Sequence, residues 1–256
     1  MDKKLQKGLG RFSDSTEATI KDRWHKCRIG ITGASGSLGR ALTERFRAKG
    51  AFVIGLTHGP IKEKQSSKKE PQEWVNWQCG QEERLNQTLA KLDILILNHG
   101  INPQGRQCTK AINESLEVNA LSSWRLIEQF ETVVENIHQL STPREIWVNT
   151  SEAEIQPALS PGYEISKRLI GQLISFKYNS QTKKQRLKLK IKKIILGPFR
   201  SKLNPIGIMK ADSVANQIVE QASSNSRLII VSPNPLTYII MPLSEGLRNA
   251  YFSIFK

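Results

Sequence analysis

A serine, a tyrosine and a lysine follow one another in the stretch NTSEAEIQPALSPGYEISKRL. Tyr163 and Lys167 are four residues apart, so in a helix they lie on one face. A nearby ammonium stabilises a phenolate and lowers the tyrosine pKa from its usual value of about 10, which allows proton exchange near neutral pH. Ser151 is expected at the end of the preceding strand. The spacing predicts proton transfer at a carbonyl oxygen held by all three groups, although in a lysine-rich chain the Tyr–Lys pair alone also arises by chance.

The elements that must position these residues alternate between strands and helices along the chain. Because the strands are continuous apolar runs such as DILILNHG, the pattern predicts an α/β fold, a doubly wound parallel sheet (Rossmann fold) in a single domain. We expect a third strand at 74–78 and helices at 82–92, 112–137, 163–180 and 211–224. The predicted organisation is a polar N-terminal arm over 1–26 without a core pattern, a catalytic domain over 27–233, and an amphipathic C-terminal arm over 234–256.

A glycine-rich turn, TGASGSLG, lies between the first buried strand and the first helix. Glycines at such a turn permit close approach of the backbone to a pyrophosphate, and the helix N-terminus favours its negative charge. A plain connecting turn is the alternative. The context predicts a dinucleotide site formed by Gly33, Ser35, Gly36, Ser37, Leu38 and Gly39.

The end of the second strand bears on the choice between NAD and NADP. An acid there bonds the ribose 2′-hydroxyl and repels a 2′-phosphate, but this strand ends in GLTH. Thr57 can donate to a phosphate, His58 can do so when protonated, and the following loop is basic. The sequence therefore favours NADP, with NAD as the alternative.

Together these motifs resemble the short-chain dehydrogenase/reductase family over about 27–233. The resemblance implies an oxidoreductase that interconverts a carbonyl and an alcohol, with Tyr163 as general acid/base. It further implies that Lys167 lowers the tyrosine pKa and bonds the nicotinamide ribose, that Ser151 polarises the carbonyl, and that Asn119 holds a water in the proton relay. By the same resemblance, further cofactor contacts are Asn98, His99 and Gly100 of NHG, and Gly197, Pro198 and Ser201 of LGPFRS.

The chain also departs from the family pattern. The turn reads T-G-x-x-G-x-x-G, the spacing of the extended subfamily, although the chain is too short for the substrate domain of that group. The aspartate that contacts adenine is missing, and Gly80 stands there. These departures keep open a catalytically inactive nucleotide-binding sensor or scaffold. In parts the chain resembles the membrane-associated hydroxysteroid-dehydrogenase-like branch, which implies a hydrophobic substrate by analogy.

The chain is strongly basic, with a formal net charge of +15. Such an excess favours polyanions: nucleic acid, an anionic membrane surface or a phosphorylated ligand. The densest basic run, KKQRLKLKIKKIIL, alternates Lys188, Lys190 and Lys192 with apolar residues, so we interpret it as a strand entry with one solvated face. No RNA-binding motif accompanies it, and we expect no nucleic-acid partner.

The last segment, NPLTYIIMPLSEGLRNAYFSIFK, places Leu243, Leu247 and Tyr251 on one helical face. Core packing or a dimer contact is the first interpretation, and an amphipathic segment on a membrane surface is the alternative. Three scattered cysteines indicate a reducing compartment, and the N-terminus lacks a secretory signal. We expect a cytoplasmic homo-oligomer without a metal site, with peripheral membrane contact as the alternative.

Overall fold

A computed structural model describes residues 23–59, 67–224 and 226–255 of the chain. In these ranges seven parallel strands form one sheet in the order β3-β2-β1-β4-β5-β6-β7, which confirms the predicted doubly wound α/β fold. The strands are β1 (Arg28–Thr32), β2 (Phe52–Thr57), β3 (Glu73–Asn76), β4 (Ile94–Leu97), β5 (Arg144–Ser151), β6 (Leu189–Leu196) and β7 (Leu228–Val231).

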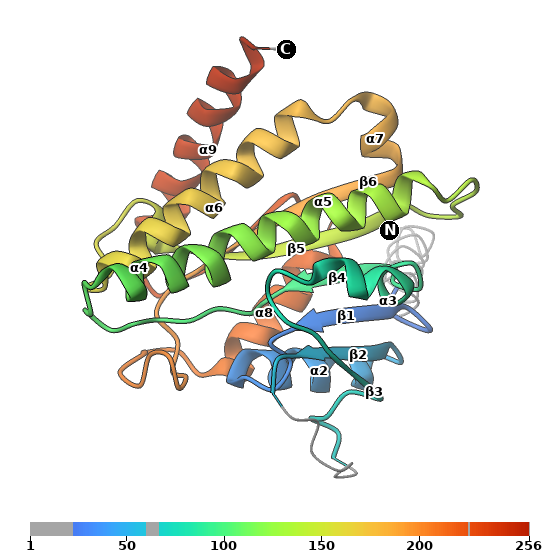
Figure 1. The fold of residues 1–256 in the computed structure, drawn as a ribbon, viewed down its shortest axis with the longest axis horizontal. Coiled ribbons are helices and arrows are strands. Elements are labelled where there is room, and N and C mark those ends of the chain that lie inside the picture. Colours follow the sequence, from blue (N-terminus) through green and yellow to red (C-terminus); the bar gives the residue numbers. More distant parts are fainter. Residues whose placement is uncertain (1–22, 60–66, 225, 256) are drawn as a thin grey trace, which may run out of the picture.

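Helices cover both faces of the sheet (Figure 1). One face packs against α2 (Ser37–Ala48) and α8 (Ala211–Ser223). The other packs against α3 (Asn86–Leu89), α5 (Ser122–Glu135) and α6 (Pro161–Ser180). The remaining helical segments are α4 (Thr109–Leu116), α7 (Lys183–Lys188), α9 (Thr237–Ser253), and the short turns η1 (Glu82–Leu85), η2 (Glu117–Leu121) and η3 (Glu152–Glu154).

Side chains of each central strand alternate between two apolar cores. Ile94 and Ile96 of β4 enter the core under α2 and α8, whereas Leu95 and Leu97 enter the core under α5 and α6. Trp24 is fully buried in the first core, with its ring centroid 5.1 Å from that of Phe46 and 5.9 Å from that of Trp147. The prediction that the arm over 1–26 takes no part in the core is therefore wrong at its end; residues 1–22 lie outside the described ranges.

Several elements differ from their predicted bounds. The third strand ends at Asn76, and the helix predicted at 82–92 is instead η1 followed by the single turn α3. The long helix predicted over 112–137 contains a π-helical turn, η2, between α4 and α5. Helix α6 begins at Pro161, two residues before Tyr163, because proline suits the first helical position, where no intrahelical hydrogen bond is lost.

The basic run forms the predicted solvated face only in its first half, where Lys183 and Lys184 are exposed and Lys188 and Lys190 are half-buried. Lys192 and Lys193 of β6 are both buried, and their side chains enter opposite sides of the sheet. Lys192 donates to the carbonyls of Ala222 and Ser224 at the end of α8, whereas Lys193 reaches the carboxylate of Glu154. The prediction failed because β6 lies between β5 and β7 with both faces covered, so neither side chain can reach water.

Helix α9 turns its polar side inward. Thr237 and Glu245 are buried together with Met241, while Leu243 and Leu247 are exposed. The first interpretation of the C-terminal segment is therefore wrong as regards core packing, whereas its other part, a dimer contact, stays a prediction. Among the described residues, no helix has the length and apolarity needed to cross a membrane.

Candidate active site

The carboxyl ends of β1, β4, β5 and β6 meet at one edge of the sheet, as parallel strands require. A cavity of about 470 Å³ opens at this edge. Nine of the predicted site residues line it: Asn98, His99, Gly100, Ser151, Tyr163, Lys167, Gly197, Pro198 and Ser201. The fold therefore gathers residues that are up to about a hundred positions apart in the chain.

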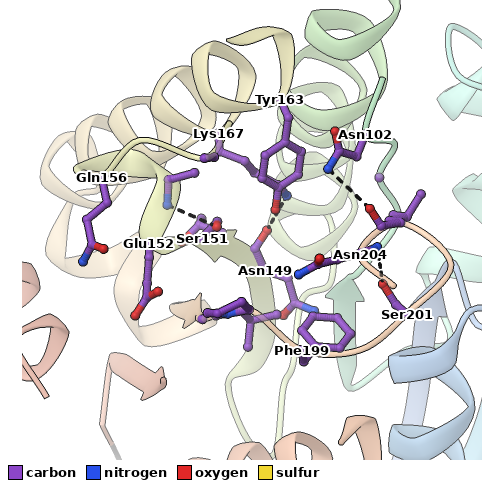
Figure 2. Close-up of a pocket in the computed structure, with 18 of the residues that line it drawn as sticks. Asn102, Asn149, Ser151, Glu152, Gln156, Tyr163, Lys167, Phe199, Ser201 and Asn204 are labelled. Atoms are coloured by element: carbon purple, nitrogen blue, oxygen red, sulfur yellow. Dashed lines mark hydrogen bonds between the residues drawn. The ribbon is translucent and has the colours of Figure 1, made fainter. Parts of the chain in front are cut away.

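Tyr163, Lys167 and Ser151 come together in this cavity. Figure 2 shows Tyr163 and Lys167 pointing from α6 toward the end of β5. The Lys167 ammonium lies 5.8 Å from the centroid of the Tyr163 ring, and it donates to the carbonyl oxygen of Asn149 at 3.1 Å. Ser151 ends β5, and its hydroxyl accepts a hydrogen bond from the Ala153 amide at 3.2 Å. The predicted convergence of the three side chains is thus present in the fold.

The electrostatics of the pair differ from the prediction. Burial raises the pKa of Tyr163, and a hydrogen bond with Ser151 opposes this shift only in part. Burial lowers the pKa of Lys167 to about 8, against the attraction of the Glu154 carboxylate. The predicted lowering of the tyrosine pKa is therefore wrong for the protein alone, because desolvation of the phenolate outweighs the hydrogen bond with Ser151. At neutral pH the tyrosine is a phenol, ready to donate a proton.

Asn119 lies beside the cavity rather than in its wall. It sits in the π-helical turn η2, a feature that often marks functional sites. Its amide oxygen accepts from the Ile101 amide at 2.8 Å, and its nitrogen donates to the Ile101 carbonyl and to the Ser166 hydroxyl. Ser166 in turn donates to the Tyr163 carbonyl at 2.7 Å. The side chain therefore ties α6 to the segment after β4; the implied role in holding a water stays a prediction.

The glycine turn has the form that a pyrophosphate requires. Gly33 has φ +63°, and a Cβ on Gly39 would stand 2.3 Å from the Gly33 carbonyl oxygen, so larger residues do not fit. Gly36 caps α2, whose first turn from Ser37 contains no acid, so the free amides there can receive an anion. Ser35 is exposed, whereas the Leu38 side chain is buried in the core, which leaves only its backbone for contact.

This turn lies next to the cavity along the same edge of the sheet. The Thr32 hydroxyl, directly before the turn, accepts from the backbone amides of Asn98 and His99 at 2.9 and 3.2 Å. His99 also bonds this hydroxyl through Nδ1 at 2.8 Å. Burial lowers the pKa of His99 to about 3, so its ring is neutral. A dinucleotide held at the turn would extend toward the cavity across these residues.

The end of β2 only partly matches its predicted role. Thr57 is nearly buried, and its hydroxyl accepts from the Gly59 amide at 3.2 Å. His58 packs on the Trp77 ring at 4.4 Å, and burial lowers its pKa. A histidine with a lowered pKa is neutral at pH 7 in the protein alone, and the contact to a 2′-phosphate expected of a protonated His58 stays a prediction.

Sequence reasoning missed a cation beside the turn. Arg40 donates from Nε to the Ser35 carbonyl at 3.2 Å and pairs with Glu70 at 3.3 Å. Its guanidinium is about half exposed, so it can reach a charged ligand at the turn. The available signal was its position directly after Gly39, the last glycine of the motif.

Sequence reasoning also missed part of the cavity wall. Polar groups face the cavity from Asn102, Asn149, Glu152, Gln156 and Asn204. The segment after β6 lines it with apolar residues: Phe199, Leu203, Ile206 and Ile208. The amides of Ile208 and Met209 both bond the Pro198 carbonyl, which folds this segment back over the site. The signal for Asn149 and Glu152 was their place on either side of Ser151.

Comparisons with known proteins agree with this geometry. Residues 29–205 match the sequence pattern of the NAD dependent epimerase/dehydratase family. The chain is 42% identical over 230 residues to a monoglucosyldiacylglycerol epimerase of Synechocystis sp., which covers 89% of this chain and 54% of that relative. The chain thus spans about half the length of this curated relative.

Solved structures with the same fold include a short-chain dehydrogenase from Burkholderia cenocepacia in complex with NADP, with a TM-score of 0.72 and 15% identity over 86% of this chain and 94% of that chain. A short-chain dehydrogenase from Sphingobium yanoikuyae in complex with NADPH has a TM-score of 0.69 and 16% identity, over 89% and 95% of the two chains. At this identity the likeness shows the fold alone. Neither comparison bears out the suggested hydroxysteroid branch.

Proposed function

Because the chain belongs to the NAD dependent epimerase/dehydratase family, we propose that it inverts or oxidises an alcohol-bearing carbon of a sugar through reversible hydride transfer. The observation that carries this proposal is the convergence of Tyr163, Lys167 and Ser151 on a cavity of about 470 Å³ beside the glycine turn. Nucleophilic or metal-assisted hydrolysis would need other side chains in those places, and it leaves the turn without a role.

The chemistry of such a carbon explains why a dinucleotide is needed. A secondary alcohol carbon has no acidic C–H bond, and an enzyme with a dinucleotide site can change its configuration by removing the hydrogen as hydride and returning it to the other face. A nicotinamide dinucleotide, when bound, supplies the acceptor and donor of that hydride. The turn from Gly33 to Gly39 fits its pyrophosphate, because both glycines are required by the backbone geometry.

The chain's own residues manage the proton and the oxygen. Tyr163 takes the proton from the substrate hydroxyl as the carbon is oxidised and gives it back as the carbonyl is reduced. Ser151 donates to the same oxygen and holds it in place. Lys167, whose charge lies 5.8 Å from the tyrosine ring, stabilises the phenolate that the oxidative half requires.

We propose a sugar carried by a lipid as the substrate. The name of the relative specifies a glucosyl diacylglycerol, and the cavity offers two matching kinds of surface. Side-chain amides of Asn102, Asn149 and Asn204 suit sugar hydroxyls. The exposed Leu159 and Ile206 on the rim suit the apolar part of such a lipid.

We propose NADP as the preferred dinucleotide, with NAD as the alternative. The described residues place no acid at the end of β2, whereas Arg40 lies beside the turn with part of its charge exposed. A guanidinium there can pair with a 2′-phosphate. The two similar dehydrogenase structures named above are themselves complexes with NADP or NADPH.

Replacement of Tyr163 by Phe tests the proposal. We expect at least about a hundred-fold loss of turnover on a glucosyl diacylglycerol, because the proton relay is removed, while NADPH binding stays within about two-fold. The product is followed by NMR of the sugar ring. Full activity in Tyr163→Phe would overturn the assignment of this residue.

A deuterium label separates inversion from net oxidation. With deuterium on the reacting carbon, an epimerase keeps the label in the product and leaves the dinucleotide pool unchanged. A dehydrogenase transfers the label to the dinucleotide in stoichiometric amount. NADPH binding without turnover on any alcohol or carbonyl would instead favour the catalytically inactive sensor or scaffold.

A further inference from the structure

Helix α9 carries an apolar stripe on its outer side. Ile239, Leu243, Leu247 and Tyr251 follow one another at intervals of four residues, so they share one face. Their exposed fractions are 67%, 63%, 66% and 57%, and Ile254 and Phe255 extend the stripe. Figure 1 shows α9 beside α6 at its start and reaching beyond the neighbouring elements toward the C-terminus. A continuous exposed apolar surface of this kind marks an interaction site.

The inner side of α9 fixes this orientation. Glu245 accepts from Lys193 at 2.6 Å and from Arg227 at 2.9 Å. Arg248 donates to Glu154 at 2.6 Å. Near the start of the helix, Thr237 donates to Glu152. Rotation of α9 to hide its apolar stripe would break all of these bonds and leave buried charges without partners, so the stripe stays outside.

The outer end of α9 carries aromatic rings that reach α6. Phe252 packs against Phe176 of α6 at 5.5 Å and against Tyr251 at 5.4 Å. Aromatic residues of this kind are favoured where an apolar phase meets water.

We propose that the outer face of α9 is a docking surface for an anionic lipid bilayer. Its apolar stripe would enter the acyl boundary, and the aromatic rings near its end would lie at the level of the headgroups. The net charge of +15 adds attraction to such a surface. A second copy of the chain fits less well, because it would bring a molecule of the same large positive charge against the first.

This surface goes beyond the proposed function, because it does not depend on which reaction occurs in the cavity. If the proposed function holds, docking would bring the catalytic cavity to a sugar carried by a membrane lipid. Binding to vesicles is therefore measured without substrate, so an inactive enzyme would leave the docking proposal intact.

The test is flotation of the purified chain with vesicles of phosphatidylcholine alone or mixed with phosphatidylglycerol. We expect the parent chain to float with the anionic vesicles and to be released by high salt. The triple variant Leu243→Ser, Leu247→Ser, Tyr251→Ser should bind the anionic vesicles at least about ten-fold more weakly, because it loses apolar area from the stripe. Leu121→Ser, an exposed leucine outside α9, is the matched control and should float like the parent.

Folding is checked by thermal unfolding and by NADPH binding, and the single variant Leu247→Glu replaces the triple variant if the latter does not fold. Two results would overturn the proposal: a parent chain that does not bind anionic vesicles, or α9 variants that bind them as well as the parent does. A change from dimer to monomer in the α9 variants, with vesicle binding unchanged, would identify the stripe as a contact between copies instead.

Discussion

Two buried lysines, Lys193 and Lys167, both interact electrostatically with Glu154 and differ in how their charge is satisfied. Lys193 in β6 donates to Glu154 at 2.8 Å, to Glu245 at 2.6 Å and to the Gly171 carbonyl at 3.0 Å, which uses all three of its protons. Lys167 in α6 donates only to the Asn149 carbonyl among the described residues. A buried ammonium group that stabilises the fold has all its hydrogen-bond donors paired within the protein. One that binds a ligand keeps donors available toward a cavity.

The largest expected effect separates the two lysines by stability. Lys193→Met should lower the free energy of unfolding by about 3 kcal/mol, because two buried carboxylates lose a partner and only the arginines at their outer ends remain. Lys167→Met should leave the free energy of unfolding at pH 7 unchanged or raise it, because it removes a charge that is costly to bury and poorly compensated. Urea unfolding of the two variants and the parent measures both values.

The comparison fails if the two variants are equally destabilised, which would mean that Lys167 is as much a structural charge as Lys193. Measurements of turnover distinguish the two lysines further. Lys167→Met should lose activity although it remains folded, whereas the defect of Lys193→Met should follow its folded fraction. The conservative change Lys167→Arg keeps the charge and serves as a control for packing alone.

The next effect is the pH dependence of stability. The pKa of Lys167 is about 8 in the folded chain, below its ordinary value of 10.5, so between these values the unfolded chain binds more protons. Stability should therefore rise with pH in this window, and below about pH 8 the penalty stays constant. From about pH 8 to about pH 9.5, the parent should gain about 1.5 kcal/mol relative to Lys167→Met.

Lys192 supplies the control for this measurement. Burial lowers its pKa to about 8 as well, so the parent contains two lysines that favour folding as the pH rises. Lys167→Met should keep the share that belongs to Lys192, and its stability should still rise across the window with a smaller slope. A constant difference between parent and variant at all these pH values would contradict the lowered pKa of Lys167.

Much of the catalytic cavity could be predicted because its signals are local. The glycine spacing and the four-residue step from Tyr163 to Lys167 are properties of single elements, and apolar strands fix the edge at which they meet. The burial of Lys193 could not be predicted from such local signals. An alternating pattern predicts one solvated face, unless partners distant in the chain satisfy the charge. Here they are Glu154 and Glu245, 39 and 52 positions away.

The predicted orientation of helix α9 failed for the same physical reason. Its period of hydrophobicity was sufficient to predict a helix, but the pattern does not say which side turns inward. The orientation is decided by charges that attract the polar side: Lys193 of β6, Glu154 of η3 and Arg227 directly before β7. The pKa of Tyr163 was wrong because desolvation depends on the whole surrounding fold rather than on one neighbour.

The smallest effect concerns a third cation, Arg40, and extends the comparison to the glycine turn. Like Lys167 it is incompletely committed, since its pair with Glu70 is half exposed, whereas His58 is held neutral on Trp77. Arg40→Ala should weaken NADPH binding about ten-fold and leave NADH binding unchanged, because only NADPH carries the 2′-phosphate. His58→Ala should change neither affinity by more than about two-fold. Nicotinamide fluorescence titrations measure all four values.

An equal loss for both dinucleotides in Arg40→Ala would show that the arginine supports the turn through Ser35 instead. A selective loss of NADPH in His58→Ala would show that the phosphate itself protonates the histidine.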